Sequence, residues 1–229
     1  MPRMGSTMRL GLIADIHADL KGLEQALTLL ERAQVDRIVC AGDLVERGPQ
    51  GDAVIARILA EKIVCVRGNH DRDVVRTRQA HTLLPRDVKR LQRMGRLLAD
   101  DSLNFLAALP PTHTLAIDDT RILLAHATPW DDVSYVLPNS PRTVFERVAD
   151  TANADVVLLG HTHIPLIARV GPVSILNAGS VCGTYTMGSH TCGILDMPEC
   201  EMIVFDIRTG QRVQAFEGLP FQSVSGDVD

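Results

Sequence analysis

Residues 12–17 read Leu-Ile-Ala-Asp-Ile-His, and this stretch indicates the fold of the chain. Three apolar residues, typical of a buried strand, lead directly into an acidic residue and then a histidine. Ligands of α/β proteins collect at the carboxyl ends of the strands, so we expect these polar side chains to lie at one edge of a sheet. Four more apolar runs end in polar residues in the same way, at 38–43, 63–71, 122–126 and 156–163.

Outward from this stretch, short strands alternate with helical patterns, which is typical of a parallel sheet with crossover helices. The second half is rich in strand patterns, and no internal repeat or linker rich in Gly, Ser and Pro interrupts the chain. We therefore expect one α/β domain over residues 1–229. The expected strands are 9–14, 37–41, 63–67, 114–117, 121–125, 156–159, 166–170, 173–176, 193–196 and 202–207, and the expected helices are 20–33, 53–60 and 143–149.

The segment at about 72–110 differs from its surroundings, and we expect it to form a helical, cap-like insertion. Pro85 separates two helical pieces, and apolar residues from Val88 to Leu98 follow one helical face. Residues 72–96 hold eight basic and two acidic side chains, a net charge of about +6. This charge fits a solvated helix face. The alternative is a lid that attracts an anionic substrate through Arg72, Arg76 and Arg86.

The composition excludes several classes of protein. The formal net charge of −5 argues against general binding to nucleic acid, which needs concentrated positive charge. No apolar stretch is long enough to span a membrane, and no targeting segment is visible. The five cysteines form no C-x-x-C pair, so we expect reduced thiols in a cytoplasmic protein.

The polar strand ends have the composition of a metal site. They contain five of the eight histidines together with carboxylates, a mixture that suits first-row transition ions better than calcium or magnesium. The candidate ligands exceed the needs of one four-coordinate ion, so we expect two divalent ions. Manganese is the ion we expect first, with iron, zinc or nickel as alternatives. Two such ions can direct a bridging hydroxide onto phosphorus, while a nearby histidine protonates the leaving oxygen.

In order along the chain, these residues resemble the calcineurin-like metallophosphoesterase superfamily. Residues 15–17 match D-x-H, 42–48 match most of G-D-x-x-D-R-G, and 68–71 match G-N-H-[DE]. His126 corresponds to the isolated histidine of the family, and 160–163 match G-H-x-H. The sequence Asn-Ala-Gly-Ser at 177–180 is similar to the N-P-G-S of its small bacterial phosphodiesterases. One such motif is weak evidence, but five in the family's order are strong evidence.

The resemblance implies a fold and a set of roles. The fold would be a four-layer αββα sandwich, in which helices flank two packed mixed β-sheets. Arg47 would face the phosphate, and His70 would be the general acid or would stabilise the transition state. Asp43 would bridge the two metals. The first metal would be held by Asp15, His17 and His163, and the second by Asn69, His126 and His161.

The neighbour of His70 and the role of Trp130 each allow two interpretations. Protein-phosphatase-like members carry Asp where this chain has Glu46, and that Asp binds the catalytic histidine. Glutamate is longer by a methylene group, so either Glu46 or Asp71 is the neighbour expected for His70, and Asp71 joins the candidate catalytic residues. Trp130 closely follows His126 and is a candidate for stacking on a nucleobase or an aromatic leaving group. Packing at the rim of the site is the alternative.

The resemblance implies a hydrolase that acts on a small phosphorylated substrate. Within the branch it indicates small phosphodiesters, including nucleotide-derived ones such as diadenosine polyphosphates. Phosphomonoesterase and protein phosphatase activities are the enzyme alternatives. A scaffold that keeps the fold without catalysis is a second class, although such members typically lack the histidine that is His70 here. A metallohydrolase of amides or lactones is a third, but it would carry its H-x-H motif early in the chain.

Overall fold

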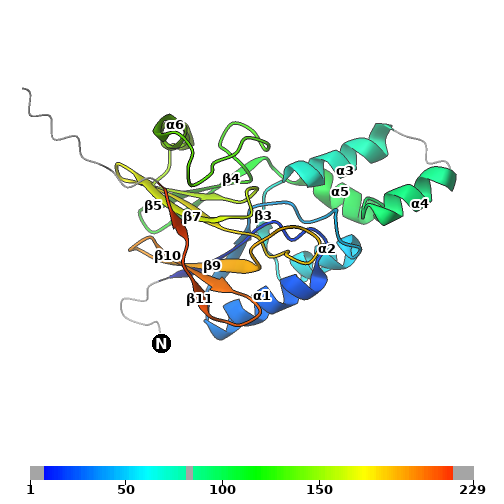
Figure 1. Cartoon of the computed structure of the whole chain (residues 1–229), viewed down its shortest axis with the longest axis horizontal. Coiled ribbons are helices and arrows are strands. Elements are labelled where there is room, and N and C mark those ends of the chain that lie inside the picture. Colours follow the sequence, from blue (N-terminus) through cyan, green and yellow to red (C-terminus); the bar gives the residue numbers. More distant parts are fainter. Residues whose placement is uncertain (1–7, 81–84, 219–229) are drawn as a thin grey trace, which may run out of the picture.

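Two six-stranded mixed sheets form the centre of the molecule in the computed structural model, which describes residues 8–80 and 85–218 (Figure 1). In the first sheet, parallel strands β1, β2 and β3 are extended by antiparallel strands. Its order is β11 (Arg212–Val213), β10 (Glu201–Asp206), β9 (Thr191–Asp196), β1 (Arg9–Ile13), β2 (Arg37–Cys40) and β3 (Val64–Cys65).

The second sheet is also mixed, because β5, β6 and β8 are parallel while the pairs β4–β5 and β7–β8 are antiparallel. Asp118 and Asp119 form the turn between β4 and β5, as their sequence predicts. The order of the sheet is β12 (Phe216–Glu217), β7 (Pro165–Val170), β8 (Val173–Ala178), β6 (Val156–Leu159), β5 (Thr120–Ala125) and β4 (Thr112–Ile117).

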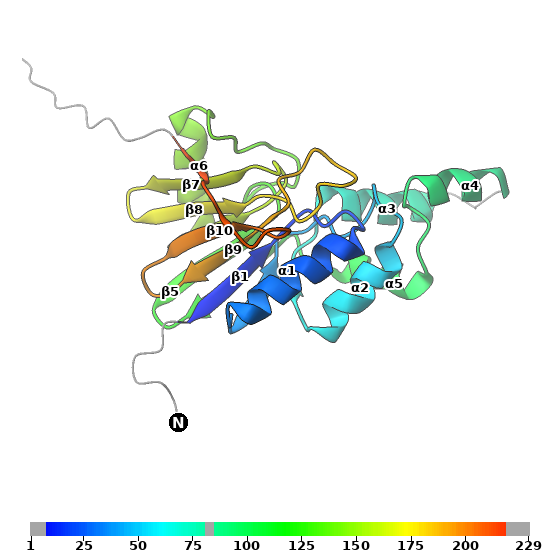
Figure 2. The same ribbon diagram turned by 60° about the horizontal axis from the view of Figure 1, so that its bottom comes forward.

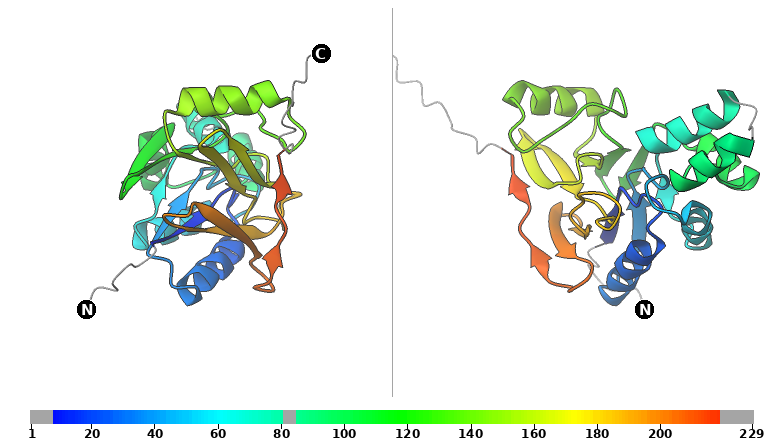
Figure 3. Two further views of the ribbon diagram at one scale, coloured as in Figure 1. Left: turned by 90° about the vertical axis from the view of Figure 1, so that its left-hand side faces the viewer. Right: turned by 45° about the vertical axis from the view of Figure 1, so that its right-hand side comes forward.

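Helices cover both outer faces of the sheet pair. Helices α1 (Leu20–Arg32) and α2 (Gly51–Ala60) pack on the first sheet, and α6 (Arg142–Ala152) packs on the second (Figure 3). Helix α1 begins where the side chain of Asp19 accepts a hydrogen bond from the backbone amide of Gly22. The expected four-layer αββα arrangement is therefore confirmed.

Three apolar cores hold these layers together. The middle core lies between the sheets and includes Leu12 of β1, Leu124 of β5 and Leu158 of β6, all fully buried. Full burial of one such leucine contributes about 1.5–3 kcal/mol. Because the middle core joins β1 to β5 and β6, it fixes the carboxyl ends of strands from both sheets in one place.

Three helices project from that end of the sheets: α3 (Asn69–Ala80), α4 (Pro85–Arg93) and α5 (Asp100–Ala108) (Figures 1 and 2). The apolar spacing that predicted one helical face as far as Leu98 is wrong beyond Arg93. Gly95 has a φ of +65°, a left-handed conformation that ends a helix. The assignment of residues 72–110 as a cap-like insertion within a single domain stays a prediction.

Three short strands differ from the strands that the sequence predicts. β3 is only two residues long, shorter than the expected strand 63–67, because the amide of Ile63 bonds to Ile58 and that of Arg67 bonds to Pro110. The strands β11 and β12 were not anticipated.

Within residues 8–80 and 85–218, no helix is both long and apolar enough to cross a membrane.

Candidate active site

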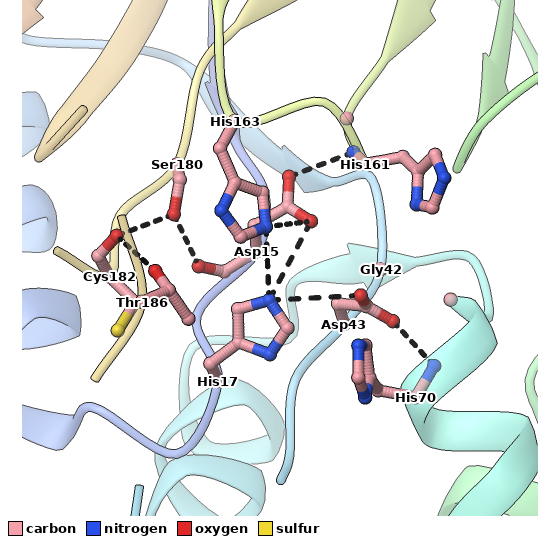
Figure 4. Close-up of polar contacts among 12 residues, drawn as sticks. Asp15, His17, Gly42, Asp43, His70, His161, His163, Ser180, Cys182 and Thr186 are labelled. Atoms are coloured by element: carbon pink, nitrogen blue, oxygen red, sulfur yellow. Dashed lines mark hydrogen bonds and ion pairs between the residues drawn. The ribbon is translucent and has the colours of Figure 1, made fainter. Parts of the chain in front are cut away.

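The seven predicted metal ligands lie together where strands of the two sheets end (Figure 4 labels five of them). Backbone hydrogen bonds join the loops, because Asp15 donates to the carbonyl of Gly42 and Gly160 donates to that of His126. The amide of His161 crosses between the sheets to Oδ2 of Asp15, 2.9 Å away. The ligands follow β1 (Asp15, His17), β2 (Asp43), β3 (Asn69), β5 (His126) and β6 (His161, His163).

Many residues of the site loops have a left-handed backbone conformation, with positive φ. Such a conformation costs an ordinary residue about 1–3 kcal/mol, and it persists only where the surrounding structure enforces it. Here it turns side chains of neighbouring loops toward one another at the end of the strands. The non-glycine site residues with positive φ are Asp15 (55°), His17 (49°), Asp43 (55°), Glu46 (71°), Arg47 (75°), His161 (67°) and His163 (59°).

A first group of ligand atoms comes from Asp15, His17 and His163. The Nε2 atoms of His17 and His163 face each other at 3.1 Å, and Oδ1 of Asp15 lies 3.3 Å from that of His163. Among the residues that the structure describes, Oδ1 of Asp15 is buried and has no hydrogen-bond partner. A buried carboxylate oxygen in this state is costly unless a cation is bound, so these residues fit a metal ion.

A second group is formed by Asp43, His126 and His161, with Asn69 beside them. Oδ1 of Asn69 lies 3.0 Å from Nε2 of His126. The other ring nitrogen of His126 bonds to the carbonyl of Ala41 at 2.7 Å, and Nε2 of His161 bonds to that of Val133 at 3.1 Å. These backbone bonds leave one nitrogen of each ring available to a metal ion.

The carboxylate of Asp43 lies between the two groups. Its Oδ2 atom is 3.8 Å from Nε2 of His17 and 3.4 Å from Nε2 of His126. Its Oδ1 atom accepts a hydrogen bond from the amide of His70 at 2.9 Å, which fixes the orientation of the group. One carboxylate oxygen therefore faces ligands of both groups.

The histidines of the two groups differ in charge. Burial lowers the pKa of His17 to about 4, although Asp43 and Asp15 oppose this shift. Burial also lowers the pKa of His126, but the charge and hydrogen bond of Asp43, with the charge of Asp15 and the bond to Ala41, together outweigh burial and raise that pKa to about 10. Near neutral pH, His17 thus offers a lone pair, whereas His126 must lose a proton before it binds a metal.

His70 and Arg47 lie beside the ligand groups. Nδ1 of His70 is 2.8 Å from Oε2 of Glu46, and Nε2 of His70 is 3.5 Å from Nη2 of Arg47. Burial lowers the pKa of His70, but its hydrogen bond to Glu46 and the charge of Asp43 outweigh burial and raise the pKa above its ordinary value. Glu46 is therefore long enough to reach the ring, and it keeps His70 ready to act as an acid.

Asp71 is not the neighbour of the His70 ring, which was the alternative that the sequence left open. Its buried carboxylate accepts hydrogen bonds from the backbone amides of Asp43, Leu44 and Gly68 at 2.8–2.9 Å. It therefore joins the loops that follow β2 and β3, while Glu46 is the neighbour of the His70 ring. The close approach of these loops needs glycine, because a β-carbon on Gly68 would collide with the Asp43 carboxylate.

Trp130 and Tyr135, two of the aromatic residues near the site, differ in exposure. The guanidinium of Arg147 lies 3.9 Å from the centre of the Trp130 ring, and Trp130 packs against the core beneath α6. Tyr135 is 62% exposed, and its ring centre lies 4.5 Å from that of His161. Substrate contact by Trp130 stays a prediction, and Tyr135 is a second candidate because its exposed ring lies beside His161.

Several residues that shape the site were not assigned a role from the sequence. The side-chain amide of Asn177 donates to the carbonyl of Gly160 at 2.6 Å, and Oγ of Ser180 lies 2.9 Å from that of Asp15. The motif at 177–180 was the signal for this pair, which supports the loops of both His161 and Asp15. No pattern in the sequence indicates the contact of Arg96 with Glu46.

The fold and this set of carboxylates, imidazoles and one amide define a metal-dependent phosphoesterase. The chain belongs to the calcineurin-like phosphoesterase superfamily, whose domain model matches residues 8–199. It is 24% identical to phosphodiesterase MJ0936 of Methanocaldococcus jannaschii over 196 residues, which cover 85% of this chain and 96% of that protein.

Two further relatives agree with this assignment. Phosphodiesterase YfcE of Escherichia coli K12 is 24% identical over 199 residues, covering 82% of this chain and 88% of that one. The crystal structure of a metallophosphoesterase from Sphaerobacter thermophilus superposes with a TM-score of 0.69 at 22% identity, covering 92% of this chain and 89% of that one. The structural likeness supports the fold, and the family supports a metal-dependent hydrolase.

Proposed function

We propose that the protein is a dinuclear phosphodiesterase that hydrolyses small phosphodiesters, including nucleotide-derived ones. The position of Asp43 is the observation that carries this proposal, because its Oδ2 atom faces both His17 and His126. A carboxylate shared by two ligand groups suits a pair of ions about 3.5–4 Å apart. Two curated relatives are named phosphodiesterases, which favours diesters over other esters.

The ligand groups suit divalent transition ions, of which we propose manganese first and iron, zinc or nickel as alternatives. Bound ions of this kind polarise the phosphoryl oxygens and lower the pKa of water. Asp15, His17 and His163 would hold one ion, Asn69, His126 and His161 would hold the other, and Asp43 would contact both.

Two residues outside the ligand groups would act on the substrate. Arg47 is exposed beside His70, so its guanidinium can bind a phosphoryl oxygen. Because Glu46 holds Nδ1 of His70, the ring presents Nε2 toward Arg47 and the site, where it can give a proton to the leaving oxygen. Asp71 would contribute by holding the loops of Asp43 and Gly68 together.

A panel of substrates tests the proposed class. The metal-loaded protein would be assayed on bis(p-nitrophenyl) phosphate, p-nitrophenyl phosphate, a diadenosine polyphosphate, a phosphopeptide, an amide and a lactone. We expect the highest kcat/KM on a diester and a loss of activity in His70→Ala. Higher kcat/KM on the monoester or the phosphopeptide would favour the corresponding phosphatase. Turnover of the amide or lactone alone would overturn the proposal.

The non-catalytic scaffold makes the opposite expectation. A scaffold would bind metal ions without turnover of any ester, and His70→Ala would then change nothing that the panel measures. The presence of His70 and its bond to Glu46 favour the enzyme, because a ring held at Nδ1 is arranged to donate from Nε2. Turnover that depends on both the metal and His70 separates the two classes.

A further inference from the structure

Glu46 joins His70 to an arginine from the helices that project beyond the sheets. Oε2 of Glu46 lies 2.8 Å from Nδ1 of His70, and Oε1 lies 2.8 Å from Nη2 of Arg96. Arg96 belongs to the connection between α4 and α5, fifty positions after Glu46. Each oxygen of the carboxylate therefore has its own partner, one on each side.

The surroundings of this carboxylate make its orientation important. The Glu46 side chain is only 6% exposed, and those of His70 and Arg96 are 18% and 22% exposed. Charge-assisted hydrogen bonds are strong and directional in such places. With Oε1 held by Arg96, the carboxylate cannot rotate without breaking a bond. The same contact therefore fixes the direction in which Oε2 meets the His70 ring.

The connection that carries Arg96 is itself docked on the loop of Glu46. A β-carbon on Gly95 would collide with the carbonyl oxygen of Gly48, so the two backbones touch. The amide of Arg96 bonds to the carbonyl of Leu91 at 2.8 Å, and that of Ala99 bonds to Oδ1 of Asp52 at 3.0 Å. Arg96 is thus presented by a segment that is anchored on both sides of it.

We propose that Arg96 is a positioning residue for ester hydrolysis, which acts on His70 through Glu46 and touches no substrate itself. The inference rests on the proposed function, because it assigns His70 a role in proton transfer. The connection between α4 and α5 then belongs to the active site, although it lies far from the ligand motifs in sequence. The Glu46 carboxylate, already bonded to His70, is held in place by this second contact.

A structural role is the competing explanation, in which Arg96 only neutralises a buried carboxylate. It predicts lower stability and a general loss of activity, with no relation to His70. A positioning role predicts that kcat falls while KM and metal content stay the same. The two explanations also differ in a Glu46→Gln background. If Arg96 acts through Glu46, its replacement should have little further effect on kcat there.

The experiment compares Arg96→Met, Arg96→Lys and Arg93→Ala on the metal-loaded protein. Arg93 is the matched control, because it is exposed on α4 and its Nε donates to the carbonyl of Lys89 on the same helix. We expect Arg96→Met to lower kcat about tenfold with unchanged KM, as supporting contacts in metal sites do. Lysine should restore part of the loss, because it keeps the charge, and Arg93→Ala should match the wild type.

Two measurements decide between the explanations. In Glu46→Gln protein, adding Arg96→Met should change kcat less than twofold, whereas a second full tenfold loss would overturn the proposal. The ring signals of His70 in NMR spectra of metal-free protein should shift in Arg96→Met and stay in place in Arg93→Ala. If no ester is turned over, the proposed function fails, but the NMR comparison still tests the contact. An unshifted His70 signal would overturn the inference alone.

Discussion

Nδ1 of His70 lies 2.8 Å from Oε2 of Glu46, so this buried carboxylate reaches the ring of the candidate general acid. This contact raises the pKa of His70 against the effect of burial. Removal of the negative charge lowers that pKa, so the protonated acid is lost at a lower pH. We therefore expect Glu46→Gln to move the alkaline limb of the kcat profile to lower pH.

The same substitution should lower kcat by about tenfold and leave the metal content unchanged, because Glu46 lies outside both ligand groups. The measurement is kcat against pH between 6 and 10, with metal analysis of each sample. Glu46→Asp is the control, since it keeps the charge but shortens the reach. An alkaline limb at the same pH in Glu46→Gln would contradict the account.

Metal binding should release a proton from one group of ligands. His126 has a pKa of about 10 in the metal-free protein, whereas that of His17 is about 4. Below pH 10 the ion held by His126 displaces a proton, so its affinity should rise about tenfold per pH unit. Calorimetry in buffers of different ionisation enthalpy counts the protons. His126→Gln should abolish this release, and a release that persists in the variant would contradict the assignment.

Tyr135 and Trp130 should differ in their effect on aromatic substrates. Tyr135 is exposed against His161, while the Trp130 ring is covered on one face by Arg147. A stacked base contributes about 1–3 kcal/mol, so we expect Tyr135→Ala to raise KM about tenfold for a substrate with a nucleobase. A methyl phosphodiester is the control, whose KM should not change. A larger rise in KM for Trp130→Phe than for Tyr135→Ala would show that Trp130, and not Tyr135, stacks on the base.

Gly68 should be required for the metal site because of its close approach to Asp43. A β-carbon there would collide with the carboxylate that faces both ligand groups. We expect Gly68→Ala to lose at least one bound ion, measured by metal analysis. Gly171→Ala is the control, since no atom lies within 4 Å of an added β-carbon there and its φ of +55° makes it the more strained backbone position of the two. Full metal content in Gly68→Ala would show that the loops can separate without cost.

Much of the fold was accessible from the sequence because the signals are local. Apolar runs such as residues 156–159 form strands whose bounds match the expectation, and the pattern of Leu23, Ala26 and Leu30 forms the buried face of α1. The motifs also located the ligands, since each follows a strand directly. Grouping them depended on the resemblance, because sequence order alone does not show which strand ends meet.

The remaining features depend on contacts between distant segments. Arg96 resembles the other arginines of a basic segment, and only the docking of Gly95 on Gly48 brings it to Glu46. The short strands β11 and β12 pair at sheet edges and have little apolar pattern of their own. Burial of Asp71 beneath backbone amides is likewise a property of two loops that meet.

Metal content and activity, measured together on one metal-stripped sample, test whether hydrolysis needs two metal ions. Manganese, nickel, zinc, iron and magnesium would be added in turn, with bis(p-nitrophenyl) phosphate as the substrate. We expect activity to appear as the second equivalent of a transition ion binds, and Asp43→Asn to bind fewer ions and stay inactive. Full activity with one ion per chain, or without any metal, would show that the site does not work through a pair of ions.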